Sequence, residues 1–438
     1  MGSPDRPFVV LVLQGGGARG AYQVGVRRAL AGADLEPDWV CGISSGALNA
    51  AVIATNESED RDRRLLSLWR SIGPVLPPPT GLPEPLQKGV RSLAALANLA
   101  GQPGFFARRP GLPFLHPKGT PGATSLFSNA PLVRTLNRHC PFDAYNHKPQ
   151  HERTRLSLGA TDVESGRLIF FDSMTSDLEV DHVAAGGALP PGSAAVPIDG
   201  RLYWDGGVAA DSPLDHILEV IESDLLLRGR RILVISVDLW SAEGTAPPDL
   251  ASAYWRQQQI QFSSRSYMAL KRFEHDLERF SLRALRAAGD GLVNGTPSEY
   301  LPSITVLHLE HGRSLDLLPL GPLDFSEEAV ATRIEQGEAE TAAALEDSDY
   351  PATLAAGGVV VRMYREGEPR GRERSLAPIA SAVPARGGVL VFEDDDGPAW
   401  SFYFSHDLPR PGTTRRGWWT RNQGDSAAFH LRPVEAPA

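Results

Sequence analysis

The first part of the chain alternates between continuous apolar runs and helical patterns. Phe8 to Leu13 is an unbroken, largely β-branched apolar run, which is typical of a strand buried on both faces of a parallel sheet. Apolar positions from Gly20 to Ala31 recur at roughly helical spacing, and Asp38 to Gly42 has the pattern of a second short strand. Ser45 to Ala54 predicts a helix of small residues. These segments predict a βαβ unit followed by a further helix, the beginning of an α/β fold.

The pattern changes between residues 56 and 125, where Pro, Gly and Arg are frequent and no sheet strand can be identified. Long segments of this kind inside a regular domain are often functional lids. We therefore expect a lid-like insertion over 56–125 with short helices of its own, such as Leu86 to Leu99. Residues 1–7 carry no periodic pattern and are expected to form a flexible N-terminus.

Regular patterns return after residue 150. Strand-like runs occur at 155–159, 167–171, 201–204, 231–237 and 304–309, and helices are predicted at 252–288 and 325–345. Ser326 is the expected N-cap of the second helix, with acidic residues in its first turn. The sequence thus predicts one α/β domain over 8–345, in which 252–345 is a helical extension. Strand-like runs at 359–364, 389–392 and 400–404 predict a separate, small β-rich appendage over 346–438.

The predicted helix at 252–288 is amphipathic. Between Arg256 and Ala288 it has seven Arg or Lys and three acidic residues, so an anionic membrane surface is one conceivable partner. Its apolar stripe is more simply explained by packing on the core of the protein. The members of the stripe are Tyr267, Leu270, Phe273, Leu277, Phe280 and Ala284.

Composition narrows the range of functions. The 438 residues carry 43 Lys and Arg against 53 Asp and Glu, a formal net charge of −10. A surface of this charge repels nucleic-acid phosphates and argues against a nucleic-acid partner. The two cysteines, Cys41 and Cys140, form no disulfide framework or CxxC metal pair, so we expect no metal and a reducing compartment. Neither a signal peptide nor a transmembrane run is recognisable. The expected location is cytoplasmic, with peripheral membrane contact left open and protein partners unknown.

The first chemical motif is glycine-rich. Gly15 to Gly20 (GGGARG) lies between the first strand and the first helix and satisfies G-x-G-x-x-G, the dinucleotide-binding fingerprint. That function requires an acidic residue at the carboxyl end of the second strand. Here Asp38 stands at the beginning of that strand instead. A Walker phosphate loop is excluded because Ala21 occupies the position of its lysine.

The second motif, Gly42 to Gly46 (GISSG), matches the G-x-S-x-G nucleophile elbow, in the required context of strand, sharp turn and helix. It makes Ser44 a candidate nucleophile, because the elbow exposes the serine hydroxyl above the start of a helix. Small flanking residues are a steric requirement of such a turn. The alternative interpretation is an ordinary Gly/Ser loop.

The glycine loop and the elbow are expected to lie side by side, because adjacent parallel strands bring their following loops to one edge of the sheet. Backbone amides around Gly16 and Gly17 are then placed to stabilise an oxyanion formed beside Ser44. Arg19, in the same loop, is a candidate for binding an anionic group of a substrate. Arg19 could instead steady the loop, and a solvated arginine at the start of a helix is an equally good interpretation.

A serine nucleophile needs a base. The histidines, among them His182 and His216, stand in no recognisable strand-end context. Asp205 is the leading candidate, because it follows the strand-like run 201–204 and precedes two glycines that permit a tight turn. Asp172 competes with it, at the end of the run 167–171, and Asp162 is a weaker candidate.

The series GGGARG, GISSG and Asp205-Gly-Gly (DGG), in this order, resembles the patatin-like phospholipases, which are lipid acyl hydrolases with a Ser-Asp dyad. The resemblance covers about residues 8–345 and is to bacterial members with a helical C-terminal extension. It implies a three-layer sandwich around a mostly parallel central sheet. It further implies that Ser44 is the nucleophile, Asp205 the base and Gly15 to Gly17 the oxyanion hole, and that no cofactor is needed.

These observations lead to the expectation of a serine acyl hydrolase that cleaves a carboxylic ester of a lipid through an acyl-Ser44 intermediate. Two other classes remain open. One is a catalytically inactive scaffold of the same fold that binds a membrane or a partner, and the other is a dinucleotide-binding protein.

Overall fold

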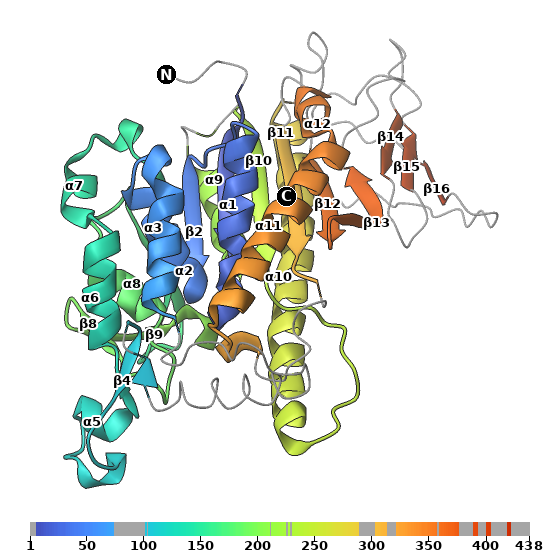
Figure 1. The fold of residues 1–438 in the computed structure, drawn as a ribbon. Coiled ribbons are helices and arrows are strands. Elements are labelled where there is room, and N and C mark those ends of the chain that lie inside the picture. Colours follow the sequence, from blue (N-terminus) through green and yellow to red (C-terminus); the bar gives the residue numbers. More distant parts are fainter. Residues whose placement is uncertain are drawn as a thin grey trace, which may run out of the picture.

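The computed structural model describes residues 6–73, 101–102, 104–210, 212–224, 227, 230–288, 303–312, 321–356 and 359–375, and three strands further on. A ten-stranded sheet forms the middle of the molecule (Figure 1). In spatial order it contains β13 (Glu368–Ser375), β12 (Val359–Arg365), β11 (Ser303–Glu310), β10 (Arg231–Asp238), β1 (Phe8–Leu13), β2 (Trp39–Ile43), β6 (Arg155–Asp162), β9 (Arg201–Asp205) and β8 (Val196–Ile198), with β7 (Leu168–Asp172) also paired to β6.

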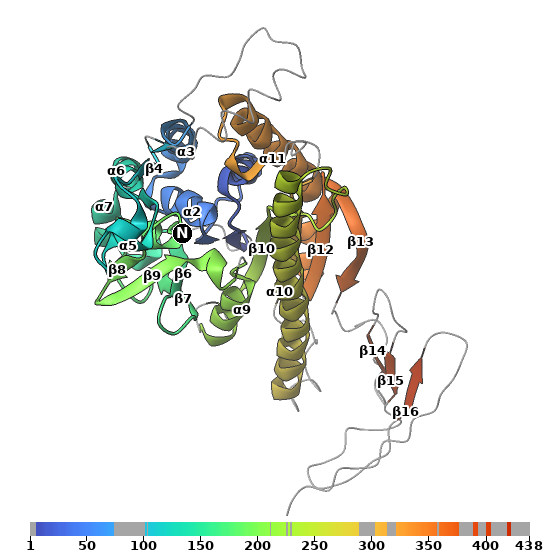
Figure 2. The same ribbon diagram turned by 90° about the horizontal axis from the view of Figure 1, so that it is seen from below.

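Helices cover both faces of this sheet (Figure 2). The larger core lies under α1 (Tyr22–Gly32), α2 (Ser45–Thr55), α3 (Ser58–Ser71), α6 (Ala130–His139), α7 (Phe142–His147), α8 (Val180–Gly186), α11 (Glu327–Ser348) and α12 (Tyr350–Ala356). The second core lies under α9 (Leu214–Ser223) and α10 (Leu250–Ala288). The expected α/β class, with three layers around a mostly parallel sheet, is confirmed.

Strand β1 shows why its sequence is apolar throughout. Val9, Leu11 and Leu13 point into the larger core, whereas Val10 and Val12 point into the second one. Successive side chains of a strand face opposite sides of the sheet, so a central strand needs apolar residues at every position. β1 is parallel to β2 and to β10, with Leu13 opposite Gly42 and Val237. The carboxyl ends of three strands therefore meet at one edge, at the lower end of the molecule in Figure 1.

The sheet changes direction beyond β6. β6 is parallel to β2, but β7 and β9 are both antiparallel to β6. Because β9 runs against β6, its last residue, Asp205, pairs with Ala160 near the end of β6. The neighbouring residue Gly159 pairs with Ile43 at the end of β2. Antiparallel pairing thus brings the carboxyl end of β9 back to the level at which β2 ends.

Helix α11 packs directly on α1 through glycines. A Cβ atom at Gly25 would lie 1.9 Å from the Ile334 carbonyl oxygen, and one at Gly337 would lie 2.1 Å from the Tyr22 carbonyl oxygen. Such distances leave no room for any side chain at the crossing point. The expected N-cap is present, since the Ser326 hydroxyl accepts a hydrogen bond from the Ala329 amide. α11 is therefore an integral part of the larger core.

The tail differs from expectation. β12 lies parallel to β11 inside the central sheet, and β13 continues the same sheet. A domain boundary at residue 346 is therefore wrong, because Val359 and Val361 bury their side chains in the second core. A separate three-stranded antiparallel sheet does occur further on, formed by β14 (Val389–Phe392), β15 (Trp400–Tyr403) and β16 (Trp418–Arg421).

The segment 56–125 is more regular than expected. Its beginning forms α3, whose Leu65, Leu68 and Trp69 lie in the larger core. A small sheet follows, made of β3 (Gly101–Gln102), β4 (Phe106–Arg108) and β5 (Phe127–Ser128), and its loop carries the short helix α5 (Pro121–Thr124). The helix predicted at 86–99 lies outside the described residues.

Helix α10 packs on the protein as the simpler interpretation predicted. Leu270, Phe273 and Leu277 are buried in the second core, but Tyr267 faces solvent, so it does not belong to the buried stripe. Phe280 and Ala284 are outside the part whose side chains are described. Within the described ranges, no helix combines the length and apolar composition that crossing a bilayer requires.

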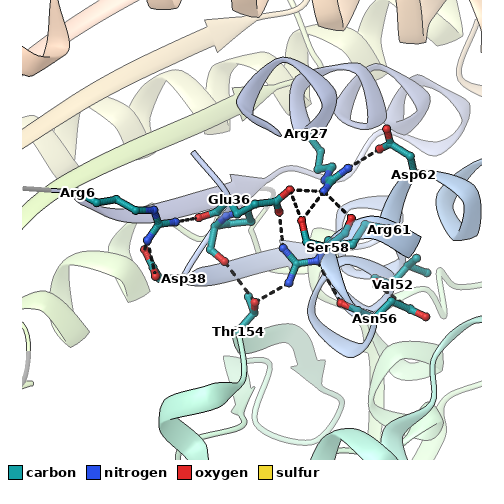
Figure 3. Close-up of polar contacts among 11 residues, drawn as sticks. Arg6, Arg27, Glu36, Asp38, Val52, Asn56, Ser58, Arg61, Asp62 and Thr154 are labelled. Carbon is teal, nitrogen blue, oxygen red and sulfur yellow. Dashed lines mark hydrogen bonds and ion pairs between the residues drawn. The ribbon is translucent and has the colours of Figure 1, made fainter. Parts of the chain in front are cut away.

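An ionic cluster joins several elements at the edge opposite the carboxyl ends of β1 and β2 (Figure 3). The Glu36 carboxylate accepts hydrogen bonds from Arg27 of α1, from Arg61 of α3 and from the Ser58 hydroxyl. Arg27 also pairs with Asp62 at 2.7 Å. Both arginines are almost fully buried, so these partners compensate charges that would otherwise be costly.

The N-terminus is attached to the same edge. Arg6, which lies in the stretch expected to be flexible, pairs with Asp38 at 2.9 Å. Asp38 also accepts a hydrogen bond from the Val9 amide at 2.8 Å. The chain is therefore anchored one residue before Pro7, and Asp38 is committed to a structural role.

The glycine crossing of α1 and α11 gives a stability prediction. Gly25→Ala should lower the free energy of unfolding by about 3 kcal/mol or more, because the added methyl group forces the two backbones apart. Gly32→Ala is the matched control in the same helix, since nothing lies within 4 Å of its Cβ position. The control should be neutral or stabilising by about 0.5–1 kcal/mol. Denaturant unfolding of both variants measures the difference, and equal effects would contradict the crossing.

Candidate active site

Ser44 stands on a strained turn between β2 and α2. Its backbone angles are φ 56° and ψ −126°, a conformation that residues with side chains rarely adopt. The turn is possible because its neighbours are glycines. A Cβ atom at Gly42 would lie 2.3 Å from the Gly46 carbonyl oxygen, and one at Gly46 would lie 2.2 Å from the Leu13 carbonyl oxygen. The steric requirement expected of GISSG is therefore observed.

Ser44 precedes the first residue of α2, and its carbonyl oxygen accepts a hydrogen bond from the Ala47 amide at 2.9 Å. The partial positive charge of the helix start thus lies beside Ser44. Ser44 is partly exposed, whereas Ser45 is buried. The two serines of the motif therefore differ in exposure, and Ser44 is the more accessible of the two.

The glycine loop packs against the elbow. A Cβ atom at Gly15 would lie 2.6 Å from the Ser44 Cβ atom, so no side chain fits at this position. Gly17 has a φ of +59° and starts a short 3-10 helix, η1 (Gly17–Ala21). The Gly16 amide donates a hydrogen bond to the Ser45 hydroxyl oxygen at 3.1 Å. Gly16 is buried, whereas Gly17 borders a cavity next to Ser44. The geometry therefore favours the Gly17 amide over the Gly16 amide as a donor to a bound group.

Arg19 does not face the cavity, in contrast to its expected role with an anionic substrate group. Its guanidinium lies 4.3 Å from the centre of the Trp240 ring and donates to the Leu239 carbonyl oxygen at 3.4 Å. The Trp240 indole nitrogen in turn donates to the Gly15 carbonyl oxygen at 2.7 Å. Arg19 and Trp240 therefore hold the glycine loop, which is the alternative role considered for Arg19.

Asp205 is buried beside the elbow. Its carboxylate accepts a hydrogen bond from the Gly207 amide at 2.8 Å, within the tight turn η4 (Gly206–Val208). A Cβ atom at Gly206 would lie 2.8 Å from the Gly159 carbonyl oxygen and 3.1 Å from Ile43. The first glycine of DGG is thus needed for close packing against the strand that carries Ser44. The structure brings Ser44, Gly15, Gly17 and Asp205 together.

The environment of Asp205 disfavours its charged form. Burial raises the pKa of the carboxyl to about 6, from a usual value of 3.8, although the Gly207 amide and the Ser44 hydroxyl both act to lower it. The Ser44 hydroxyl is thus near enough to the carboxyl to influence its ionisation. A carboxylate with this pKa is a stronger base than an exposed one and is still ionised at neutral pH.

The competing acids lie elsewhere and have structural partners. Asp172 accepts from the Ser157 hydroxyl at 2.6 Å and pairs with Arg155 at 2.9 Å. Burial raises the pKa of Asp172, but the His216 contact and Arg155 outweigh it and hold the pKa well below its ordinary value. Asp162 pairs with Arg201 at 2.6 Å. Asp172 pairs with Ser157 in the first half of β6, away from the edge at which Ser44 lies.

The two histidines considered above are also engaged elsewhere. The His216 ring stacks on Phe170 at 4.0 Å, and His182 takes part in the N-terminal capping box of α8. Both side chains contribute to packing or to helix capping. The histidines singled out in the sequence therefore play no part in the arrangement around Ser44.

The cavity beside Ser44 is small, about 30 Å³, and mostly apolar. The Trp69 and Phe325 rings are stacked at 6.1 Å, and Phe105 lies 5.9 Å from Phe325. These side chains come from α3, from the segment between β3 and β4, and from the residues that precede α11. The lining consists of Gly17, Ser44, Ser45, Leu48, Trp69, Ile72, Phe105, Gly187 and Phe325. This lining favours an apolar group beside Ser44 over a polar one.

Sequence reasoning missed the aromatic walls of the cavity and the Trp240 support. Trp69, Phe105 and Phe325 are far apart in the chain and belong to no motif. Trp69 offered a weak signal, because its helix has a regular apolar stripe. Phe325 and Trp240 offered none, since single aromatic residues outside a pattern are most often core residues.

Comparison with known proteins shows a match to one protein family. The model of the patatin-like phospholipase family matches residues 11–218. The solved structure of VipD from Legionella pneumophila shares 14% sequence identity with this chain. The match covers 78% of this chain and 67% of the VipD chain, with a TM-score of 0.35. Full-length ExoU from the type III secretion system of Pseudomonas aeruginosa, solved in complex with SpcU, shares 17% sequence identity. That match covers 80% of this chain and 70% of the solved chain, with a TM-score of 0.25. The search of curated proteins found no match.

The buried carboxyl of Asp205 predicts an effect on stability. Because its pKa is raised in the folded state, ionisation of Asp205 costs stability; the cost is absent below about pH 4 and complete above about pH 6. Asp205→Asn should therefore raise the free energy of unfolding at pH 8 by up to about 3 kcal/mol. The gain should vanish at pH 4, because the carboxyl is then uncharged in both states.

Asp172→Asn is the matched control, since the same exchange breaks a buried ion pair with Arg155. It should lower the melting temperature at pH 8, where Asp205→Asn raises it. Thermal unfolding at both pH values tests the pair of variants. A loss of stability at pH 8 in Asp205→Asn would contradict the conclusion that burial disfavours the charged form of Asp205.

Proposed function

Because residues 11–218 belong to the patatin-like phospholipase family, we propose that this protein is a serine hydrolase that cleaves carboxylic ester bonds of lipids. Ser44 is the nucleophile and Asp205 is the base. One observation carries the proposal: the strained, partly exposed Ser44 borders an apolar cavity, and its hydroxyl lies close enough to the buried Asp205 carboxyl to influence its pKa. A dinucleotide-binding function fits less well, because Asp38 is engaged with Arg6 and with the Val9 amide at the opposite edge of the sheet.

The first half of the reaction forms an acyl-enzyme. The Ser44 hydroxyl oxygen attacks the carbonyl carbon of the ester, and its proton passes to the Asp205 carboxylate. A tetrahedral oxyanion results. Its collapse breaks the bond between the carbonyl carbon and the alcohol oxygen, and the alcohol leaves with the proton held by Asp205. The acyl group remains on Ser44.

Water completes the cycle. Asp205, again ionised, takes a proton from a water molecule whose oxygen attacks the acyl carbon. The second tetrahedral intermediate collapses, the Ser44 oxygen recovers a proton from Asp205, and a carboxylic acid is released. An aspartate is a weak base compared with histidine, so much of the rate enhancement must come from stabilisation of the oxyanion.

Two backbone features supply that stabilisation in the proposed mechanism. Gly17 borders the cavity, and its backbone amide is the assigned donor, while the start of α2 contributes a partial positive charge beside Ser44. The Gly16 amide is engaged with the Ser45 hydroxyl and supports the loop. Gly15 contributes by lacking a side chain next to Ser44. In this assignment, the three glycines expected to form the oxyanion hole have three different tasks.

The cavity suggests which part of a substrate lies beside Ser44. Leu48, Trp69 and Phe325 offer apolar walls, and burial of hydrocarbon against them is favourable by roughly 25 cal/mol for each Å² of apolar surface. An acyl chain fits this environment, whereas a charged head group does not. We therefore assign the cavity to the acyl side of the ester.

Activity measurements test the two catalytic residues. Ser44→Ala should lower kcat for ester hydrolysis by roughly a thousandfold or more, because the covalent route is lost. Asp205→Asn should cost nearly as much, since the two residues act as one unit, whereas Asp172→Asn should keep most of the activity. A fluorophosphonate probe should label the wild-type protein at Ser44. Labelling of Ser45, or a fully active Asp205→Asn variant, would show that the residues are misassigned.

The pH dependence follows from the same carboxyl. Asp205 must be ionised to accept a proton, and burial raises its pKa to about 6. The value of kcat/KM for a soluble ester should therefore fall about tenfold for each pH unit below about 6 and be level just above it. A pH-rate profile of the free enzyme measures this, and a limb centred near pH 4 would mean that Asp205 titrates like an exposed acid.

A further inference from the structure

The loop between β4 and β5 ends in an exposed apolar tip. Phe114 is 79% exposed and Leu115 is 71% exposed, and Leu112 beside them is also exposed. They stand in and before the short 3-10 helix η2 (Pro113–Leu115). Figure 1 shows α5, which follows this tip, projecting beyond α6 and β4 at the lower end of the molecule, the end at which β1 and β2 finish. Large apolar side chains on a projecting loop are costly in water unless something covers them.

The surroundings of this tip are basic. From residue 101 to residue 129 the chain has three Arg and Lys and no acidic residue, on a protein with a net charge of −10. Arg108 and Lys118 flank the tip and are exposed. The complete set is Arg108, Arg109 and Lys118. Apolar tip and positive rim together match the surface of a bilayer with anionic lipids.

Aromatic side chains connect the tip to the cavity beside Ser44. Phe105 lines that cavity and lies 5.6 Å from Phe106, which lies 4.8 Å from Phe127. The Phe127 amide donates to the Gly192 carbonyl oxygen at 2.8 Å. This bond ties the base of the tip to the segment that carries Gly187, another residue of the cavity lining, and the exposed Leu189. Aromatic contacts therefore run from the cavity to the base of the loop that carries the exposed tip.

From these observations we propose that residues 106–126 form a docking surface for an anionic lipid bilayer. Phe114 and Leu115 enter the region between head groups and acyl chains, while Arg108 and Lys118 contact lipid phosphates. The Ser44 cavity then faces the layer from which an ester lipid is drawn. The reason for docking, access to a lipid ester, rests on the proposed function. The observations that support docking concern residues 106–126 and are independent of Ser44 and Asp205.

Vesicle binding by the full-length protein tests the surface. Wild type should co-sediment with vesicles of phosphatidylcholine and phosphatidylglycerol in equal parts, and far less with vesicles of phosphatidylcholine alone. The double variant Phe114→Ala/Leu115→Ala should bind the mixed vesicles about tenfold or more weakly. The matched control is Tyr267→Ala/Met268→Ala on α10, whose side chains are 53% and 60% exposed. The control should bind as wild type does, and all proteins should melt at the same temperature.

A soluble short-chain ester separates docking from catalysis. The tip variant should hydrolyse it at the wild-type rate but hydrolyse lipids in mixed vesicles about tenfold more slowly. Absence of ester turnover, with tip-dependent vesicle binding retained, would reject the proposed function and keep the docking surface.

Three results would overturn the docking surface itself. The first is that wild type does not bind mixed vesicles. The second is that the tip and α10 variants bind equally, which would make the attraction nonspecific. The third is a dimer in light scattering that the tip variant dissociates, because a second copy of the chain would then be what covers Phe114 and Leu115.

Discussion

The close approach of α2 to the end of β1 is the constraint on which this site depends. The backbone at Gly46 lies against the Leu13 carbonyl, and the backbone at Gly42 lies against Gly46. No side chain fits at either glycine, so the turn between them is forced to be sharp, and Ser44 takes the strained φ of 56°. This one contact places the Ser44 hydroxyl outside the sheet and the start of α2 beside it, where negative charge is favoured.

Strain and buried charge have to be compensated by the surrounding structure, and a buried polar network supplies much of this. Asn49 of α2 donates to the Gly20 carbonyl oxygen at 2.8 Å and to Gln23 at 2.9 Å, and it accepts from the Trp69 indole at 3.0 Å. Gln23 donates to the Gln14 carbonyl oxygen at 2.7 Å. The network joins the glycine loop, the elbow helix and a wall of the cavity, so these parts hold one another in place.

The antiparallel half of the sheet supplies the carboxylate of the site, Asp205. Parallel strands bring Gly15 and Ser44 to one edge, but the carboxylate arrives on β9, which runs in the opposite direction and ends at that edge. Gly206 allows β9 to pack closely enough to bury Asp205. Burial is what raises the pKa of Asp205, and it also excludes the water that would stabilise the charge. Position and basicity of this carboxyl therefore share one cause.

Local features were predictable from the sequence alone, because they depend on neighbours in the chain. The apolar run of β1, the strained turn at Ser44 and the Asp205 turn each follow from a few consecutive residues. Features that depend on distant residues were decided only by the tertiary structure. Arg19 lies against Trp240 instead of facing the cavity, Phe325 completes the aromatic wall, and β12 joins the central sheet instead of starting a separate appendage. In each case the partner is about two hundred or more residues away or lies on a neighbouring strand, and contacts of that kind leave no periodicity or spacing in the chain from which they can be inferred.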